Sequence, residues 1–91
     1  LIIDEGARKV LLNNGSSLLS AGVKSISGDF SRGELVSCID DTGREIARGL
    51  INYSATDTRK IVGKSSDKFE DILGYSSEPE LIHRDNMIVL Q

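Results

Sequence analysis

Gly63-Lys64-Ser65 is the part of this sequence that most resembles a phosphate-binding loop. Such a loop requires another glycine five residues before Gly63, and this position is occupied by Thr58. The four residues between are not glycine-rich, so few backbone amides would converge on a phosphate group. Gly28 and Gly33 have the required separation, but Glu34 follows where a lysine is needed. We therefore predict a helix end at Gly63 and no nucleotide site at either position.

His83 and Cys38 are the only histidine and the only cysteine, so a metal site of the usual Cys/His kind is excluded unless carboxylates dominate it. A nucleophilic triad would have to use His83 as its base, and nothing in the spacing supports this. Cys38 stands among aliphatic residues, which predicts a buried, inert thiol. The acidic pairs Asp40-Asp41 and Glu70-Asp71 fit a turn and a helix surface, and hard-cation binding at them stays open as an alternative without support in the spacing. We predict no catalytic residue and no metal site in these 91 residues.

The net charge of −3 argues against strong, non-specific binding to polyanions, which depends on many basic side chains. The charge is uneven: residues 44–68 have six basic and three acidic side chains, whereas residues 69–91 have one and five. A local basic surface therefore stays open as an alternative to ordinary solvated faces. No apolar run is long enough to span a bilayer and no signal-peptide pattern is present, so we expect a cytoplasmic protein with no membrane partner.

The elements that would position these residues are short. Asp4 is a candidate N-cap, Asn14-Gly15 a candidate helix stop, and Asp40 to Gly43 a tight turn between two Val/Ile/Leu-rich strands. Ser54 and Asp57 have the spacing of a helix start. The pattern predicts strands near 1–3, 23–27, 35–39, 45–53, 81–84 and 87–90, and helices near 5–13, 54–62 and 66–73.

Some apolar positions are predicted to face the core. In the N-terminal third these are Ala7, Val10 and Leu11 at helical spacing, Leu18 and Leu19 as anchors, and Val23 with Ile26. Further along, Phe69, Ile72 and Leu73 repeat the helical spacing before Gly74. With two Phe, two Tyr and no Trp, aliphatic side chains must supply most of the core.

Three motifs resemble those of the PUA domain, a small RNA-binding β-barrel module. They are Ala21-Gly22-Val23, the Phe-x-x-Gly-Glu run from Phe30 to Glu34, and the Gly-x-x-Ile-Ala-x-Gly run from Gly43 to Gly49. The later segments 71–75 and 83–88 extend the resemblance over essentially the whole chain, to the C-terminal PUA domain of the bacterial glutamate 5-kinase family.

The resemblance implies a mainly β fold with short helices (α+β), a PUA-like pseudobarrel of about six strands. Residues 1–91 would form a single domain, the C-terminal fragment of a larger enzyme; a start at Leu1 inside a strand agrees with a fragment. The implied parent phosphorylates L-glutamate with ATP and Mg²⁺ in the first step of proline biosynthesis, and it is a homo-oligomer. Its amino-acid-kinase domain is the expected partner, so this fragment is expected to bind no cofactor and to be no enzyme itself.

The resemblance also implies an RNA surface around the first helix, the glycine-containing loop after it and neighbouring strands. On this sequence that surface comprises Gly22, Val23 and Lys24, with Arg32 and Arg48 as phosphate partners. A purely structural role for the glycines stays open, because no aromatic residue stands among these basic positions to stack on bases.

Two functions therefore remain for the domain: RNA binding, or a regulatory or assembly role that tunes the kinase and its response to proline. Fold resemblance alone is weak support for function. An alternative parent is another protein with an RNA-binding PUA module, such as an RNA-modifying enzyme. The segment from His83 to Met87 argues against that parent.

Overall fold

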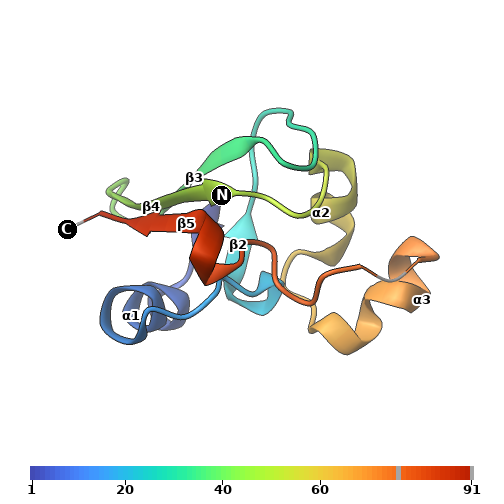
Figure 1. The fold of residues 1–91 in the computed structure, drawn as a ribbon, viewed down its shortest axis with the longest axis horizontal. Helices are drawn as coiled ribbons and strands as arrows, with labels where there is room; N and C mark the ends of the chain where they lie inside the picture. Colours follow the sequence, from blue (N-terminus) through green and yellow to red (C-terminus); the bar gives the residue numbers. More distant parts are fainter. Residues whose placement is uncertain (76, 91) are drawn as a thin grey trace.

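The computed structural model describes residues 1–75 and 77–90, which form one five-stranded sheet with helices packed around it (Figure 1). The sheet order is β2-β1-β3-β4-β5, and only the β1–β3 pair is parallel. The α+β class with a mainly stranded core is confirmed, with five strands where about six are predicted. The strands are β1 (Ile2–Ile3), β2 (Val23–Ser25), β3 (Leu35–Ile39), β4 (Glu45–Leu50) and β5 (Met87–Val89); the helices are α1 (Glu5–Asn14), α2 (Ala55–Ile61) and α3 (Phe69–Leu73), with single 3₁₀ turns η1 (Ser20–Gly22), η2 (Ser66–Lys68) and η3 (Arg84–Asn86).

The predicted hairpin is formed by β3 and β4. Its turn is closed by Asp40, whose Oδ1 accepts the Thr42 amide at 2.9 Å, the Thr42 hydroxyl at 2.7 Å and the Arg44 amide at 3.1 Å. Gly43 completes the turn with a φ of 86°, which glycine adopts without steric cost. β4 ends at Leu50 rather than Tyr53; beyond it Ile51 still bonds to Gly33 and Glu34, while the Asn52 amide donates to the Leu81 carbonyl at 2.8 Å.

α1 begins and ends where its capping residues predict, within one residue. Asp4 Oδ1 accepts the Ala7 amide at 2.8 Å, and Gly15 ends the helix in the left-handed region with a φ of 59°. β2 ends at Ser25 instead of Ser27. Its pairing with β1 stops at Ser25, which lies opposite Ile2.

The two later helices also follow their local signals. The Ser54 hydroxyl accepts the Asp57 amide at the start of α2. α2 ends before Gly63, and the predicted third helix divides into the turn η2 and the short helix α3. Gly74 ends α3 with a φ of 80°. In the part of the chain that the structure describes, no helix has the length and apolar character needed to cross a lipid bilayer.

The predicted strand at 81–84 is wrong. Only one isolated bridge forms there, between Leu18 and Ile82. Leu18 uses both backbone groups for it: its amide donates to the Ile82 carbonyl and its carbonyl accepts the Leu81 amide, both at 2.9 Å. Pairing stops at this point because His83 turns the chain into η3, where its Nδ1 accepts the Asp85 amide.

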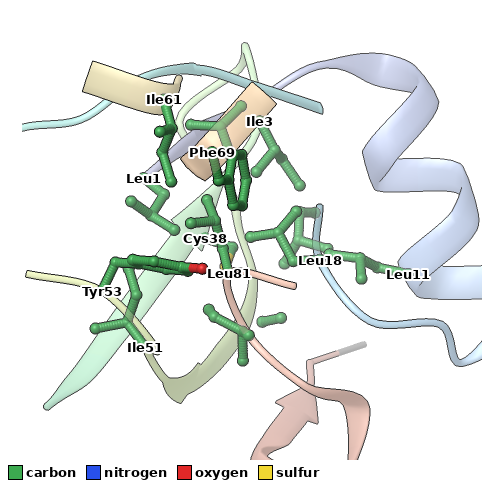
Figure 2. Close-up of a cluster of buried hydrophobic side chains, with 14 residues drawn as sticks. Leu1, Ile3, Leu11, Leu18, Cys38, Ile51, Tyr53, Ile61, Phe69 and Leu81 are labelled. Atoms are coloured by element: carbon green, nitrogen blue, oxygen red, sulfur yellow. The ribbon is translucent and has the colours of Figure 1, made fainter. Parts of the chain in front are cut away.

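The core lies between the sheet, α1 and the two C-terminal helices, and Figure 2 shows its buried side chains. It is mostly aliphatic, as the composition predicts. One aromatic pair completes it: the rings of Tyr53 and Phe69 meet edge to face, with centroids 5.6 Å apart. Cys38 is fully buried in the same cluster, and desolvation raises the pKa of its thiol to about 11. The prediction of a buried thiol is therefore confirmed.

Candidate nucleic-acid interface

Gly22 and Val23 lie where η1 passes into β2, against the first turns of α1. A Cβ on Gly22 would lie 2.6 Å from the Ala7 Cβ, and the Gly22 carbonyl accepts the Asp4 amide at 2.9 Å. The requirement for glycine at 22 is thus explained by helix packing. Val23 is only 2% exposed, so its side chain belongs to the core rather than to a ligand-facing surface.

Lys24 and Arg48 are both exposed, and both are paired with carboxylates. Lys24 Nζ lies 2.9 Å from Asp41 Oδ1. Arg48 holds Glu45 through two bonds, Nε to Oε2 at 2.8 Å and Nη2 to Oε1 at 2.9 Å. Hydrogen bonds from Arg48 and from Ser37 lower the pKa of Glu45 to about 2, so this carboxylate stays ionised at neutral pH. Each of these two cations has a local counter-charge that a phosphate would have to displace.

Arg32 is exposed on the loop before β3. Within residues 1–75 and 77–90, no carboxylate lies within ion-pair distance of it. The Tyr75 hydroxyl donates to Asp57, and this bond raises the pKa of Tyr75 to about 12. The five residues predicted from the sequence include no aromatic side chain that could stack on bases.

The five predicted residues do not form one compact site. β2 and β4 are separated by β1 and β3 in the sheet, which at about 4.8 Å per strand places Lys24 and Arg48 on strands roughly 14 Å apart. Arg32 lies on a third element. The structure therefore brings together Gly22, Val23 and Lys24, while Arg32 and Arg48 stand separately.

A groove beside Gly22 was not predicted. It has a volume of about 360 Å³ and lies between α1 and the segment from Ser16 to Gly22. Val10 and Leu19, predicted as core residues, line this groove instead and are 39% and 53% exposed. Small residues at the helix contact draw α1 close to η1, which leaves these two side chains outside the core. The groove is lined by Gly6, Ala7, Val10, Leu11, Ser16, Ser17, Leu18, Leu19, Ala21 and Gly22, none of them charged.

Gly63-Lys64-Ser65 has a structural role. The Gly63 amide donates to the Ser20 carbonyl at 2.9 Å, and the Ser20 hydroxyl donates to the Lys64 carbonyl at 2.5 Å. These bonds tie the end of α2 to η1, so the backbone groups of the segment are used within the fold. Among the described residues, no three His, Cys, Asp or Glu side chains gather as metal ligands would.

Known proteins resemble this chain in sequence and in fold. The family model described as "PUA domain" matches residues 1–73. Proteins named glutamate 5-kinase are 58% identical in Hahella chejuensis over 99% of this chain, and 56% identical in Thioalkalivibrio sulfidiphilus over 99%. The chain spans about a quarter of the length of these relatives, 23% and 24% respectively.

Solved structures show the same fold. A conserved PUA domain protein from Thermoplasma acidophilum is 30% identical, with a TM-score of 0.57 over 63% of this chain and 37% of its own. A PUA domain from Aeropyrum pernix, solved as a tartrate complex, has a TM-score of 0.64 over 90% of this chain and 39% of its own, at 19% identity. On the evidence of the family model, the fold and these relatives, the chain belongs to the PUA domain family.

Proposed function

We propose that residues 1–91 are the C-terminal PUA domain of a cytoplasmic glutamate 5-kinase, in which they act as a non-catalytic accessory domain. The observation that supports this most is the 58% identity to a glutamate 5-kinase over 99% of the chain. The whole enzyme would phosphorylate the γ-carboxylate of L-glutamate with ATP and Mg²⁺. Both would be bound by an amino-acid-kinase domain outside these residues, and the whole enzyme would be a homo-oligomer.

The chemistry of the side chains supports a non-catalytic role. The Cys38 thiol is buried and its pKa is raised to about 11, the reverse of an activated nucleophile. His83 uses its Nδ1 to accept the Asp85 amide in η3, so this nitrogen is engaged within the backbone turn. Neither residue has the environment of a catalytic group.

The surface favours protein contact over polyanion contact. Leu35 and Leu50 face each other across the hairpin, and both are exposed, at 64% and 43%. Ile88 on the neighbouring β5 is 69% exposed. Apolar side chains on adjacent strands are typical of surfaces that contact another protein or domain. We infer that the domain regulates or helps assemble the kinase, including its response to proline.

The test uses the full-length gene product, with and without residues 1–91. The full-length protein is expected to phosphorylate glutamate at the expense of ATP, measured as γ-glutamyl hydroxamate. Removal of the domain is expected to change proline inhibition or oligomeric state, measured by initial rates and by light scattering after gel filtration. No glutamate-dependent ATP consumption by the full-length protein would refute the parent enzyme. Unchanged inhibition and assembly after the deletion would refute the accessory role.

RNA binding is the second candidate, supported by family membership and by the exposed Arg32, which has no carboxylate within ion-pair distance among the described residues. Under this proposal Lys24, Arg32 and Arg48 contact phosphates. The protein backbone at Gly22 and Val23 approaches the sugar-phosphate backbone of the RNA. Labelled structured RNA would be titrated at low and at physiological salt. Binding that weakens with salt and is reduced by Arg32→Ala, but not by the control Lys68→Ala on η2, supports it. No binding at low salt removes it.

A further inference from the structure

The backbone of Leu1 makes a regular rung with β3. The Leu1 nitrogen donates to the Ser37 carbonyl at 2.8 Å, and the Leu1 carbonyl accepts the Ile39 amide at 2.8 Å. In a parallel ladder, one residue bonds to two residues of the neighbouring strand that are separated by one position. The rung at Leu1 continues the parallel pair between Ile2 and Ile39. The position of β1 beside β3 is therefore fixed at Leu1. Because the two strands are parallel, residues before Leu1 would lie beside β3 in the direction of Leu35.

Two further backbone groups of β3, the Ser37 N–H and the Leu35 C=O, lie where residues before Leu1 would pass. Successive residues of a strand direct their N–H and C=O groups to opposite edges. Since Ser37 C=O and Ile39 N–H point to β1, the Ser37 N–H and the Leu35 C=O point to the same edge, away from β4. β1 is the neighbour of β3 on that edge, and its contacts with β3 begin at Leu1.

A slot lies at this edge. It has a volume of about 260 Å³, and Leu1 stands among its walls together with β3. The opposite wall is the loop after β2. Because β1 runs antiparallel to β2, with Ile2 opposite Ser25, a strand extended backward from Leu1 would run past this loop. The slot thus lies on the path of β1, and its lining residues are Leu1, Ser27, Asp29, Phe30, Glu34, Leu35, Val36, Ser37 and Ile39.

We propose that the residues immediately before Leu1 in the longer protein fill this slot as a backward continuation of β1, parallel to β3. The residue two positions before Leu1 accepts the Ser37 N–H and donates to the Leu35 C=O. This inference rests on the proposed function, in which a kinase domain precedes residues 1–91. The junction between the two domains is then a paired strand, and it fixes their relative orientation more firmly than a flexible linker would.

The charges of the slot fit a polypeptide segment better than a nucleic acid. Asp29 and Glu34 are its charged lining residues, and no lysine or arginine lines it. Two carboxylates repel phosphate groups, whereas a peptide backbone satisfies the groups on β3 without any charge. Neutral or basic side chains are therefore expected in the segment that occupies the slot.

The test is hydrogen exchange at the Ser37 amide in the full-length protein. Three versions are compared: the natural sequence, proline at the residue two before Leu1, and alanine at the same position. Proline lacks the N–H that would donate to the Leu35 carbonyl but keeps the carbonyl that accepts the Ser37 N–H, so faster exchange at Ser37 reports a less stable strand pairing; alanine retains both groups. We expect the proline version to exchange about tenfold faster at Ser37, as loss of roughly one net hydrogen bond implies, and the alanine version to match the natural sequence.

Equal exchange in all three versions would overturn the proposal. So would protection of Ser37 in the isolated 91-residue chain that rises with protein concentration or on adding RNA, because a second copy or a nucleic acid would then occupy the slot. Glutamate-dependent ATP consumption is measured on the same preparations. Slow Ser37 exchange without this activity refutes the parent enzyme alone, whereas activity with fast Ser37 exchange in the natural sequence refutes the strand continuation alone.

Discussion

At the scale of single residues, two glycines are required by close packing rather than by a turn. Gly49 lies within β4, and a Cβ there would lie 2.5 Å from the Ile82 Cγ2 and 2.8 Å from the Asn86 carbonyl oxygen. Gly22 has the same constraint against Ala7. Neither glycine has a positive φ. Both glycines let two segments that are distant in the chain pack in direct contact, and both belong to the motifs that resemble the family.

The first prediction concerns Gly49. Gly49→Ala is expected to lower the free energy of unfolding by about 1–3 kcal/mol, because the added methyl group cannot fit without shifting backbone. Gly6→Ala is the matched control: its Cβ would meet only Asp4 Oδ1, at 3.4 Å, and alanine favours the helix by about 0.5 kcal/mol or more. Urea unfolding followed by circular dichroism measures both. Equal effects of the two substitutions would contradict the packing argument.

The second prediction concerns the Cys38 thiol, which ionises near pH 9 when exposed and at a pKa of about 11 in the fold. Because the folded pKa is raised, the folded state binds more protons than the unfolded state between these values. Stability is therefore expected to fall as pH rises from 9 to 11, by about 2 kcal/mol. Cys38→Ala, which cannot titrate, should show a smaller fall over the same range. An identical fall in both proteins would show that other groups are responsible.

At the scale of elements, α1 depends on its N-cap. Asp4 Oδ1 accepts the Ala7 amide, and the Asp4 amide donates to Gly22, so this residue joins the helix start to η1. We predict that Asp4→Ala lowers the free energy of unfolding by about 1 kcal/mol and that Asp4→Asn largely retains it, since asparagine also caps well. Thermal unfolding of the two variants gives the comparison. A loss for Asn as large as that for Ala would mean that the carboxylate charge, and not the cap, is what stabilises α1.

Elements with strong local signals could be predicted from the sequence. The caps at Asp4 and Ser54, the helix end at Gly74 and the hairpin turn at Asp40 depend on residues within a few positions of one another. The strand predicted at 81–84 failed for the opposite reason. Its apolar residues are buried, but whether they form a ladder depends on Leu18, more than 60 residues earlier.

The candidate site was less predictable than the fold. The side chains of Val10 and Leu19 have the same local pattern as core residues, and only the close contact between α1 and η1 leaves them in the groove. The pairing of Lys24 with Asp41 across 17 residues is likewise a property of the tertiary structure. Residue type can predict a cation, but its counter-charge depends on which segments the sheet places side by side.

At the scale of the whole molecule, the charge pattern opposes strong RNA binding in two ways. The net charge is −3, and Lys24 and Arg48 each form an ion pair with a carboxylate, Asp41 and Glu45 respectively. Exposed ion pairs contribute little to stability, so these two can be removed without unfolding the domain. Neutralising the two carboxylates leaves Lys24 and Arg48 able to contact phosphates. The effect of local pairing can therefore be separated from the effect of net charge by comparing variants of equal charge.

The fourth prediction uses this separation. The double variant Asp41→Asn with Glu45→Gln is expected to bind structured RNA more tightly than the natural sequence. Because up to two further phosphates are contacted, the plot of log affinity against log salt should steepen by on the order of 1. The control, Glu70→Gln with Asp71→Asn on α3, changes net charge by the same amount but leaves Lys24 and Arg48 paired. Fluorescence anisotropy across a salt series distinguishes the two. If both doubles bind equally well, net charge alone governs binding and the two ion pairs do not mask a phosphate-binding surface.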